Sequence, residues 1–497
     1  MKAASRADRA ASILELPVEV QTHILQQLAY LHHQSMRAVL LTCKHLHHIA
    51  LPLSVHTYEN VTAKNMSQHA QKRSRNLDFL RHITITHPEL AHNVRRISII
   101  HVSTSLIYRL APTNKRPLGP ASDEMAAYTD LIDASGLSSH IENWDAVRDE
   151  WLRGLADGLV EQQIGLLLLA CPRLETLKLG TPLSPRLLPR LIRAAARRAM
   201  ISTSGAAPGT KRPLLDSLRQ YFGEPESPKT LFHFFNIGKE FLRLPQLRSF
   251  ACASLSNSGP NGHLFNEEAN PPGCSNVQHM TLLDTNVTIE GLRSLIWACR
   301  GLKSFHWTPG DSTFSDMQIK LPDLAQALLP HRETLQHLHI DYQDRWRKMD
   351  WYCKRDNFFI GTFLRDMTSM KTLHIGMEAF MGFTDLWNMD CEQSSVPREE
   401  RLHEINKVSR LVSYIPPSLQ FLELHGCTLE IVPHVQDLLN LLQTEETFAS
   451  MRKIRLCFSA DHVDPRALAL TFDARRVDFG YSFRFHSSDP EIPVMRR

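Results

Sequence analysis

Apolar side chains recur at helical spacing in two successive stretches between residues 16 and 50. The first stretch repeats every four residues, which predicts an amphipathic helix with Pro17 in its first turn. Its apolar stripe consists of Leu16, Val20, Ile24 and Leu28. The second stretch keeps a 3.6-residue period from Met36 to Ala50. It predicts one continuous helix, which Pro52 ends.

A helical pair of roughly forty residues rarely contains enough apolar surface to form a stable core by itself. Its apolar faces must therefore be completed by other residues. Two interpretations follow from the pattern. The pair packs on the rest of this chain, or it docks the helices of a partner protein.

The motif in this segment favours the second interpretation. The residues L-P-x-E-V-x-x-x-I-L-x-x-L, followed by L-L-T-C-K-H-L-H-H-I-A-L-P-L, resemble an F-box over residues 12–58. The resemblance implies binding to a Skp1-like adaptor, and through it to a cullin, within an SCF-type E3 ubiquitin ligase. It implies the contact residues Leu16, Pro17, Val20, Ile24, Leu28, Leu40, Cys43, Leu46 and Ile49. The aromatic residue that many F-boxes carry after the second helix is missing, as in short F-boxes of fungal type.

A short apolar pattern, L-x-x-L-x-L, recurs along the rest of the chain. From residue 247 onward its copies are separated by roughly 25 to 50 residues. The ten copies are Leu80-Ile83-Ile85, Val94-Ile97-Ile99, Leu174-Leu177-Leu179, Leu247-Phe250-Cys252, Val277-Met280-Leu282, Leu302-Phe305-Trp307, Leu335-Leu338-Ile340, Met370-Leu373-Ile375, Leu419-Leu422-Leu424 and Met451-Ile454-Leu456. Each predicts a turn followed by a short strand with two inward-facing residues.

Helical spacing fills the segments between several of these strands, namely 144–159, 289–299 and 321–329. The unit is therefore helix, turn and strand, and stacked units place a parallel sheet on the concave side and helices on the convex side. Residues 76–460 resemble an irregular leucine-rich-repeat solenoid of this kind. The alternative is a doubly wound α/β domain, which also alternates strands and helices. That fold would need a glycine-rich phosphate turn after its first strand, and the sequence has none.

The fold class is thus α/β, with a short helical F-box followed by the solenoid. The expected order is a disordered N-terminus (1–11), the F-box (12–58), the solenoid (76–460) and a C-terminal cap or tail (461–497). Loop insertions are expected near 111–122, 201–213, 254–275 and 341–356. The last is charged and aromatic, which suits a protein-binding hot spot, single-stranded nucleic acid, or a loop whose aromatic residues pack inward.

Composition excludes several classes of protein. Of the 497 residues, 43% are hydrophobic and 22% charged, which is typical of a folded soluble protein. The formal net charge of +4 is too small for a basic stripe, so we expect no nucleic-acid partner. The nine cysteines form no CxxC pair, which favours a reducing compartment. With no apolar leader and no apolar run near the ~18 residues of a membrane helix, we expect a protein of the cytoplasm or nucleus and no membrane association.

No catalytic or phosphate-binding motif is present, so we expect no enzyme activity, no catalytic residue and no cofactor. An F-box adaptor needs none, because it raises the local concentration of a target protein beside the ubiquitin carrier. Two alternatives remain open. One is a scaffold that acts without the ligase, with the helical pair capping the solenoid. The other is an RNA-binding solenoid that uses the insertion at 341–356.

The target-binding positions follow from the strand geometry, because the residues that flank the central apolar residue point outward. Those we assign to target binding are Lys178, His279, His306, His337, His339, His374, Glu423, Lys453 and Arg455. Five of the 26 histidines fall in this set. Such a column could bind a metal ion, or gain charge below pH ~6.5 and attract an acidic ligand. We take it as a solvated ladder and assign no metal ligand.

Overall fold

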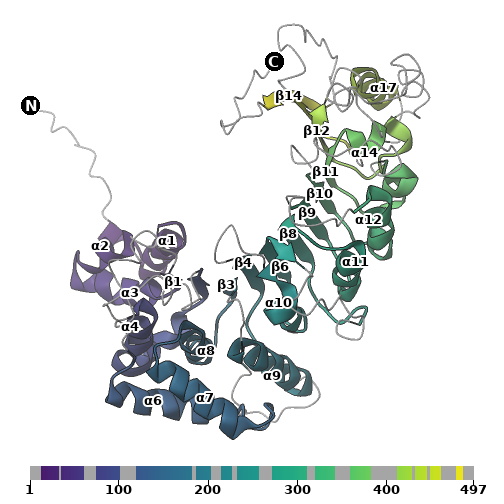
Figure 1. The fold of residues 1–497 in the computed structure, drawn as a ribbon. Helices are drawn as coiled ribbons and strands as arrows, with labels where there is room; N and C mark the ends of the chain where they lie inside the picture. Colours follow the sequence, from purple (N-terminus) through teal and green to yellow (C-terminus); the bar gives the residue numbers. More distant parts are fainter. Residues whose placement is uncertain are drawn as a thin grey trace, which may run out of the picture. The chain divides into compact units, whose positions relative to one another are not determined.

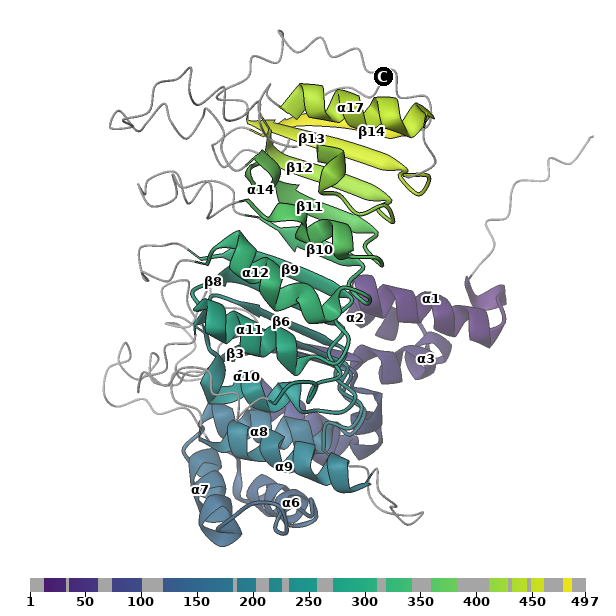
Figure 2. The same cartoon turned by 90° about the vertical axis from the view of Figure 1, so that its right-hand side faces the viewer.

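The computed structural model divides the chain into two compact units, residues 1–221 and 222–497 (Figures 1 and 2). Each unit alternates short strands with helices, and each is described by itself. The structure describes residues 13–32, 35–60, 74–100, 119–181, 186–202, 214–225, 232–256, 271–310, 319–341, 359–381, 411–427, 431–444, 448–459 and 477–484. Residues 1–11, most of the four expected loop insertions and the aromatic cluster near 346 lie outside these ranges.

Unit 1 begins with a helical segment. It contains η1 (Ile13–Glu15), α1 (Val18–Leu31), α2 (Met36–Leu40) and α3 (Lys44–Ser54). The single helix expected over 36–50 was wrong, because a turn at residues 41–43 separates α2 from α3. This turn lets Met36 and Leu46, on two different helices, reach the same apolar cluster. Pro52 lies inside α3 and does not end it. Because proline has no N–H group, the carbonyl oxygen of His48, four residues earlier, has no helical donor, and His48 is exposed.

Three parallel strands follow one another in unit 1. They are β1 (Thr57–Asn60), β2 (Arg96–Ile99) and β3 (Thr176–Thr181). β1 pairs with β2 and β2 with β3, so that Tyr58, Ile97 and Leu177 stand in one register row. The helices of this unit are α4 (Arg75–Arg81), η3 (His82–Thr86), η4 (Pro88–Asn93), α6 (Ser122–Asp133), α7 (Trp144–Ala156), α8 (Val160–Ala170) and α9 (Leu187–Ser202).

One of the ten strand predictions was wrong. Residues 80–85 continue from α4 into the π-helical turn η3. Leu80 and Ile83 are fully buried, whereas Ile85 is 38% exposed. Three-residue spacing places Leu77, Leu80 and Ile83 on one face of a helix. Leu80 and Ile83 of the predicted strand motif are therefore buried as part of a helix and not as part of a strand.

Unit 2 is a stack of parallel strands in chain order. Its main strands are β6 (Ser249–Ala253), β8 (His279–Thr285), β9 (Ser304–Pro309), β10 (His337–Ile340), β11 (Thr372–Gly376), β12 (Phe421–Cys427), β13 (Lys453–Ser459) and β14 (Asp478–Arg484). β4 (Gln220–Pro225) lies at the boundary of the units, and β5 (Phe232–His233) pairs with β7 (Leu255–Ser256). The other nine strand motifs therefore form strands as predicted.

Helices cover one side of this stack (Figure 2). They are α10 (Phe234–Leu242), α11 (Ile289–Ala298), α12 (Leu321–Leu328), α14 (Glu378–Met381) and α17 (Ile431–Thr444), with the 3₁₀ turns η6 (Leu329–His331), η8 (Gly361–Asp366) and η9 (Leu411–Ser413). The strand residues that face them are buried: Leu373 and Ile375 of β11 are fully so. The residues between them face the other side of the sheet, as the two-residue period of a strand requires. The solenoid pattern predicted from sequence is confirmed in this unit.

Five of the described strands lie outside the ten predicted motifs, namely β1, β4, β5, β7 and β14. β1 falls at the end of the segment assigned to the F-box, and β14 falls in the segment assigned to a cap or tail. β14 pairs with β13 over its whole length, from Lys453–Asp478 to Ser459–Arg484. Its sequence alternates Phe479, Tyr481 and Phe483 with polar or small residues, which is the signal that could have predicted it.

Candidate functional site

The three N-terminal helices surround a small core of their own. Its buried members are Leu25, Ala29, Met36, Leu46 and Ala50. A buried polar link reinforces it: the Nε2 of Gln21 donates to the Leu16 carbonyl oxygen at 2.7 Å, and the Oε1 of Gln21 lies 2.8 Å from the Nε2 of His45. This link ties the start of α1 to the start of α3. The orientation of α1 is therefore fixed by apolar packing and by a satisfied buried amide.

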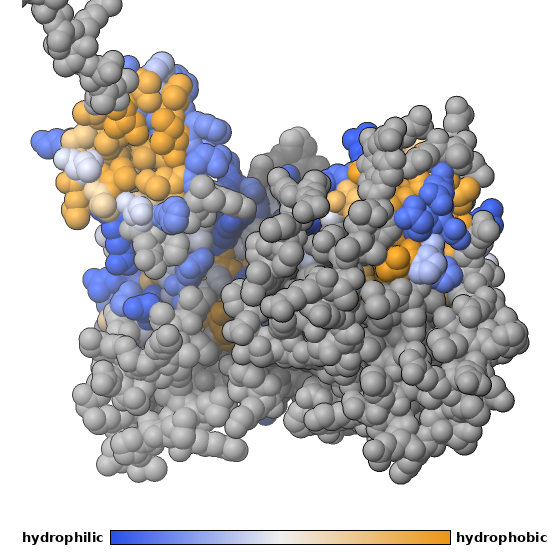
Figure 3. Space-filling model, turned by 90° about the horizontal axis from the view of Figure 1, so that it is seen from above, coloured by the Kyte–Doolittle hydropathy of each residue, from blue (hydrophilic) through white to orange (hydrophobic). Residues whose placement is uncertain are grey.

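The outer side of these helices is unusually apolar. Six large hydrophobic side chains are exposed among the described residues, and five of them lie between residues 14 and 41. They are Leu14 (50% exposed), Val18 (51%), Val20 (43%), Ile24 (39%) and Leu41 (87%). Figure 3 shows the resulting orange area over the N-terminal helices. Contiguous exposed apolar surface of this kind marks an interaction site.

The nine residues implied by the F-box resemblance all lie in this helical segment, but at different depths. Pro17, Val20 and Ile24 are at the surface, and Leu16 is half-buried. Leu46 belongs to the core, and four others pack against it: Leu28, Leu40, Cys43 and Ile49. The surface set is thus smaller than the resemblance implies. It also contains Leu14, Val18 and Leu41, whose exposure the sequence pattern did not reveal.

A second cluster lies on the face of the unit 2 sheet opposite the helices. His306, His339, His374 and Glu423 stand in one register row across β9, β10, β11 and β12. The rings of His306 and His339 stack with centroids 4.0 Å apart and an interplanar angle of 5°. The rings of His339 and His374 stack at 4.9 Å and 22°. Parallel pairing thus turns dispersed histidines into a continuous stack.

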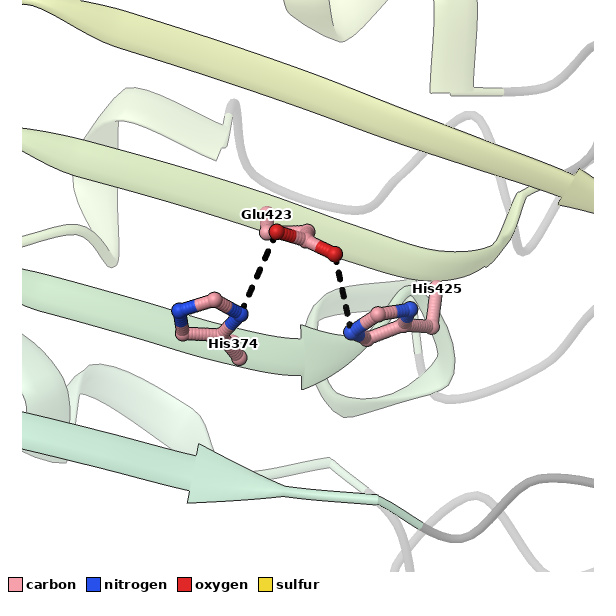
Figure 4. Close-up of side chains that lie close together, drawn as sticks. All are labelled: His374, Glu423 and His425. Atoms are coloured by element: carbon pink, nitrogen blue, oxygen red, sulfur yellow. Dashed lines mark ion pairs between the residues drawn. The ribbon is translucent and has the colours of Figure 1, made fainter. Parts of the chain in front are cut away.

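Glu423 ends this stack between two histidines (Figure 4). Its Oε2 lies 3.3 Å from the Nδ1 of His374, and its Oε1 lies 3.7 Å from the Nε2 of His425. His425 shares the face because it is two residues beyond Glu423 on β12, and it is only 5% exposed. The Cys457 thiol of β13 donates to the same Oε1 at 3.8 Å. The site therefore gathers two imidazoles, a carboxylate and a thiol.

The site's electrostatics follow from its burial. Burial by itself would raise the pKa of Glu423, but the hydrogen bond from His374 and the charges of His425, His374 and Arg455 lower it to about 2. The carboxylate is therefore ionised at neutral pH. Burial lowers the pKa of His339 to about 4, and the nearby His306 and His374 add to this effect. The His339 ring is neutral at neutral pH, which leaves it one nitrogen lone pair.

Comparison with protein families agrees with this architecture. A family model described as a leucine-rich repeat domain matches residues 137–467, and no F-box model matched. The chain belongs to the leucine-rich repeat family. No curated protein matches the chain.

Leucine-rich repeat solenoids present extended concave surfaces, and the domain is a scaffold for protein interactions. The predicted target-binding residues of this repeat domain lie on the strands as expected, but only four of them belong to the cluster. They are His306, His339, His374 and Glu423. His279 and His337 are exposed in a different register row, and Lys178 belongs to unit 1.

The remaining two predicted residues lie on β13. The Nζ of Lys453 is 3.4 Å from a carboxylate oxygen of Asp478 and 5.7 Å from the centre of the Phe421 ring. Arg455 is exposed beside Glu423 in the register. His425 and Cys457 were missed because we selected only the residues that flank the central apolar residue of each strand motif. Both β12 and β13 run at least two residues beyond the second apolar residue of their motifs.

No described helix is long and apolar enough to cross a membrane.

Proposed function

We propose that this leucine-rich repeat protein is the substrate-recognition subunit of an SCF-type ubiquitin ligase. In this proposal α1 and its neighbours dock a Skp1-like adaptor, which carries the cullin, and the repeat domain recruits a target protein. The observation that carries it is the exposure of Val20 and Ile24, four residues apart on α1. They adjoin a core that is already complete without them.

Two features support a helical partner at this surface. Three of the contact residues that the F-box resemblance implies, Pro17, Val20 and Ile24, are exposed. Neighbouring Leu14 and Val18 extend the apolar area along the start of α1. An amphipathic partner helix would bury these side chains at about 25 cal/mol per Å² of apolar surface.

The proposed role requires no catalytic residue in this chain. A ligase subunit accelerates ubiquitin transfer by holding the target beside the ubiquitin carrier, which raises the effective concentration of the two reactants. The rigid repeat stack suits this task, because it keeps a fixed orientation between the residues that contact the target. In this proposal the target is a protein that binds the strand face of the repeat domain.

The test is co-purification of a Skp1-like adaptor with the full-length chain. The double variant Val20→Asp, Ile24→Asp places two charges on the exposed stripe and is expected to abolish co-purification. The matched control is His23→Asp, Gln26→Asp, which adds the same charges to exposed positions elsewhere on α1. Retention of the adaptor by the stripe variant, or loss in both variants, would contradict the proposal.

A second function is favoured by one observation. The helical segment continues directly into β1, and the carbonyl oxygen of His56 accepts hydrogen bonds from the backbone N–H groups of Arg95 and Arg96, both at 3.0 Å. The segment therefore covers one edge of the repeat strands in unit 1. A scaffold that acts without the ligase would use it only as this cap. Failure of the full-length chain to bind the adaptor, together with lower stability on removal of residues 1–60, would favour the scaffold.

A further inference from the structure

The strand face of unit 2 contains a set of donor atoms that neither the repeat fold nor adaptor binding requires. His374, Glu423 and His425 each offer one ligand atom, and these atoms lie within 4.8 Å of one another. Two of the three side chains come from β12 and one from β11. From this arrangement we propose that the three residues bind a divalent transition-metal ion, Zn²⁺ by the chemistry of the donors.

The distances match those of a metal site. Zn²⁺ binds histidine nitrogen at about 2.0–2.1 Å and carboxylate oxygen at about 2.0–2.2 Å, so tetrahedral ligand atoms lie roughly 3.4 Å apart. The Nδ1 of His374 is 3.3 Å from the Oε2 of Glu423, and the Nε2 of His425 is 3.7 Å from the Oε1 of the same carboxylate. The three donor atoms lie within 4.8 Å of one another, so the side chains must move closer together to bind one ion.

The backbone holds this arrangement in place. His374 and Glu423 are direct register partners in the parallel β11–β12 pair. Glu423 and His425 share one face of β12 because they are two residues apart. The pairing of β12 with β11 therefore positions the three ligands, with His425 opposite Gly376, although the pairing of β12 with β13 shifts register between Leu424 and Cys427. Ligands carried by strands give a more rigid site than ligands on a loop.

The surroundings of the three side chains support metal binding. The His339 ring stacks on His374 at 4.9 Å and on His425 at 6.1 Å, which restricts the rotation of both imidazoles. The Cys457 thiol donates to the carboxylate of Glu423 at 3.8 Å. Such supporting contacts orient metal ligands and are worth about 10–100-fold in affinity.

The donor set also restricts which ion fits. Two imidazoles and one carboxylate suit zinc and its neighbours in the first transition row, whereas Mg²⁺ and Ca²⁺ prefer sites built of oxygen. A divalent cation would lie between the half-buried imidazole of His374, the buried imidazole of His425 and the carboxylate of Glu423.

The experiment uses tag-free, full-length protein that has been treated with a chelator and dialysed. Titration with ZnCl₂ against a chromophoric chelator is expected to show one tight site per chain at neutral pH. His374→Ala, His425→Ala and Glu423→Gln are each expected to weaken that site at least tenfold. The controls are His279→Ala and His337→Ala, which remove exposed histidines from a neighbouring row of the same face.

A second measurement separates loss of metal from loss of fold. Zn²⁺ is expected to raise the Tm of the parent chain and of both controls, because a ligand that binds only the folded state stabilises it. The three ligand variants should keep a cooperative transition in chelator but show no shift with Zn²⁺. Absence of a stoichiometric site in the parent chain, or equal affinity in parent and ligand variants, would overturn the proposal. Neither measurement involves the Skp1-like adaptor, so this proposal and the proposed function can fail separately.

Discussion

Ile24 and Leu25 are adjacent on α1, yet 39% of Ile24 is exposed whereas only 2% of Leu25 is. The helical period sends one side chain to the surface stripe and the other into the cluster that holds the three helices together. Stability therefore depends on Leu25, whereas the proposed adaptor binding depends on its neighbour Ile24.

Alanine substitutions at these two positions should affect different properties, namely the stability of the chain at Leu25 and the proposed adaptor binding at Ile24. Leu25→Ala removes part of a five-residue core and is expected to lower the free energy of unfolding by about 2–5 kcal/mol. Ile24→Ala should change it by less than about 1 kcal/mol while weakening adaptor binding. Chemical denaturation and a quantitative pull-down, both on the full-length chain, measure the two effects. A large stability loss from Ile24→Ala would mean that the exposed stripe is covered by this chain itself.

A second prediction concerns the contact between α8 and α9. The Oε1 of Glu161, on α8, accepts hydrogen bonds from the backbone N–H groups of Arg186, Leu187 and Leu188 at 2.9, 2.8 and 2.9 Å. A carboxylate at this position satisfies the N–H groups that a helix leaves unpaired at its start and complements its dipole. Glu161→Ala is expected to lower the free energy of unfolding by about 1–3 kcal/mol.

The control for this cap is Glu150→Ala. The Glu150 carboxylate approaches the guanidinium groups of Arg186 and Arg190 at 3.8 and 3.9 Å, but it is exposed and bonds to no backbone N–H group of α9. Its loss should cost less than about 1 kcal/mol, as for other surface ion pairs. Equal effects in the two variants would show that Glu161 acts through general charge and not as a cap.

Much of this fold was predictable because the repeat imposes a short, regular pattern. Leu302, Phe305 and Trp307 predicted a turn and a strand, and β9 contains both of the expected inward residues. Leu80, Ile83 and Ile85 carried the same pattern but formed a helix, since three-residue spacing fits either structure. Only the neighbours along the chain decide which structure forms, and a three-residue motif does not include them.

The candidate sites were predictable only in part, for a physical reason. The sequence placed His374 and Glu423 on outward strand positions, but their contact depends on the β11–β12 register, which joins residues nearly fifty positions apart. Likewise, the period of α1 marked Val20 and Leu28 as one apolar stripe. Which of them faces solvent depends on where α2 and α3 pack. Local periodicity identifies faces, whereas tertiary packing decides which faces meet.

A third prediction tests the close approach of β2 and β3. A Cβ atom on Gly180, in β3, would overlap the backbone carbonyl of Ile100, directly after β2. A backbone group cannot move aside as a side chain can, so Gly180→Ala should destabilise unit 1 by about 1–3 kcal/mol. At Gly301 a Cβ would lie 3.8 Å from the Cγ2 of Thr334, an ordinary contact, and Gly301→Ala should be nearly neutral. Thermal unfolding of the two variants compares these outcomes.

The final prediction is a pH dependence of stability at His331. Its ring is 2% exposed and links successive repeats: Nδ1 accepts from the Leu302 N–H at 3.4 Å, and Nε2 donates to the Ile296 carbonyl oxygen at 2.9 Å. Only the neutral ring can make both bonds, because protonation removes the acceptor at Nδ1. Burial lowers the pKa of His331 below its ordinary value of 6.5, although the bond to Ile296 opposes this.

The sign of the effect follows from the two states of the chain. Below about pH 6.5 the unfolded state binds a proton at His331 before the folded state does, so stability falls as the pH decreases from 6.5 toward the folded pKa. His331→Asn should lower the free energy of unfolding at pH 7.5 by about 1–3 kcal/mol, because a buried bond is lost. It should also flatten the decline between pH 7 and 5, whereas His48→Asn, at an exposed position, should alter neither. Urea titrations in the presence of chelator measure both quantities. An unchanged pH slope in His331→Asn would mean that the ring titrates alike in the folded and unfolded chain.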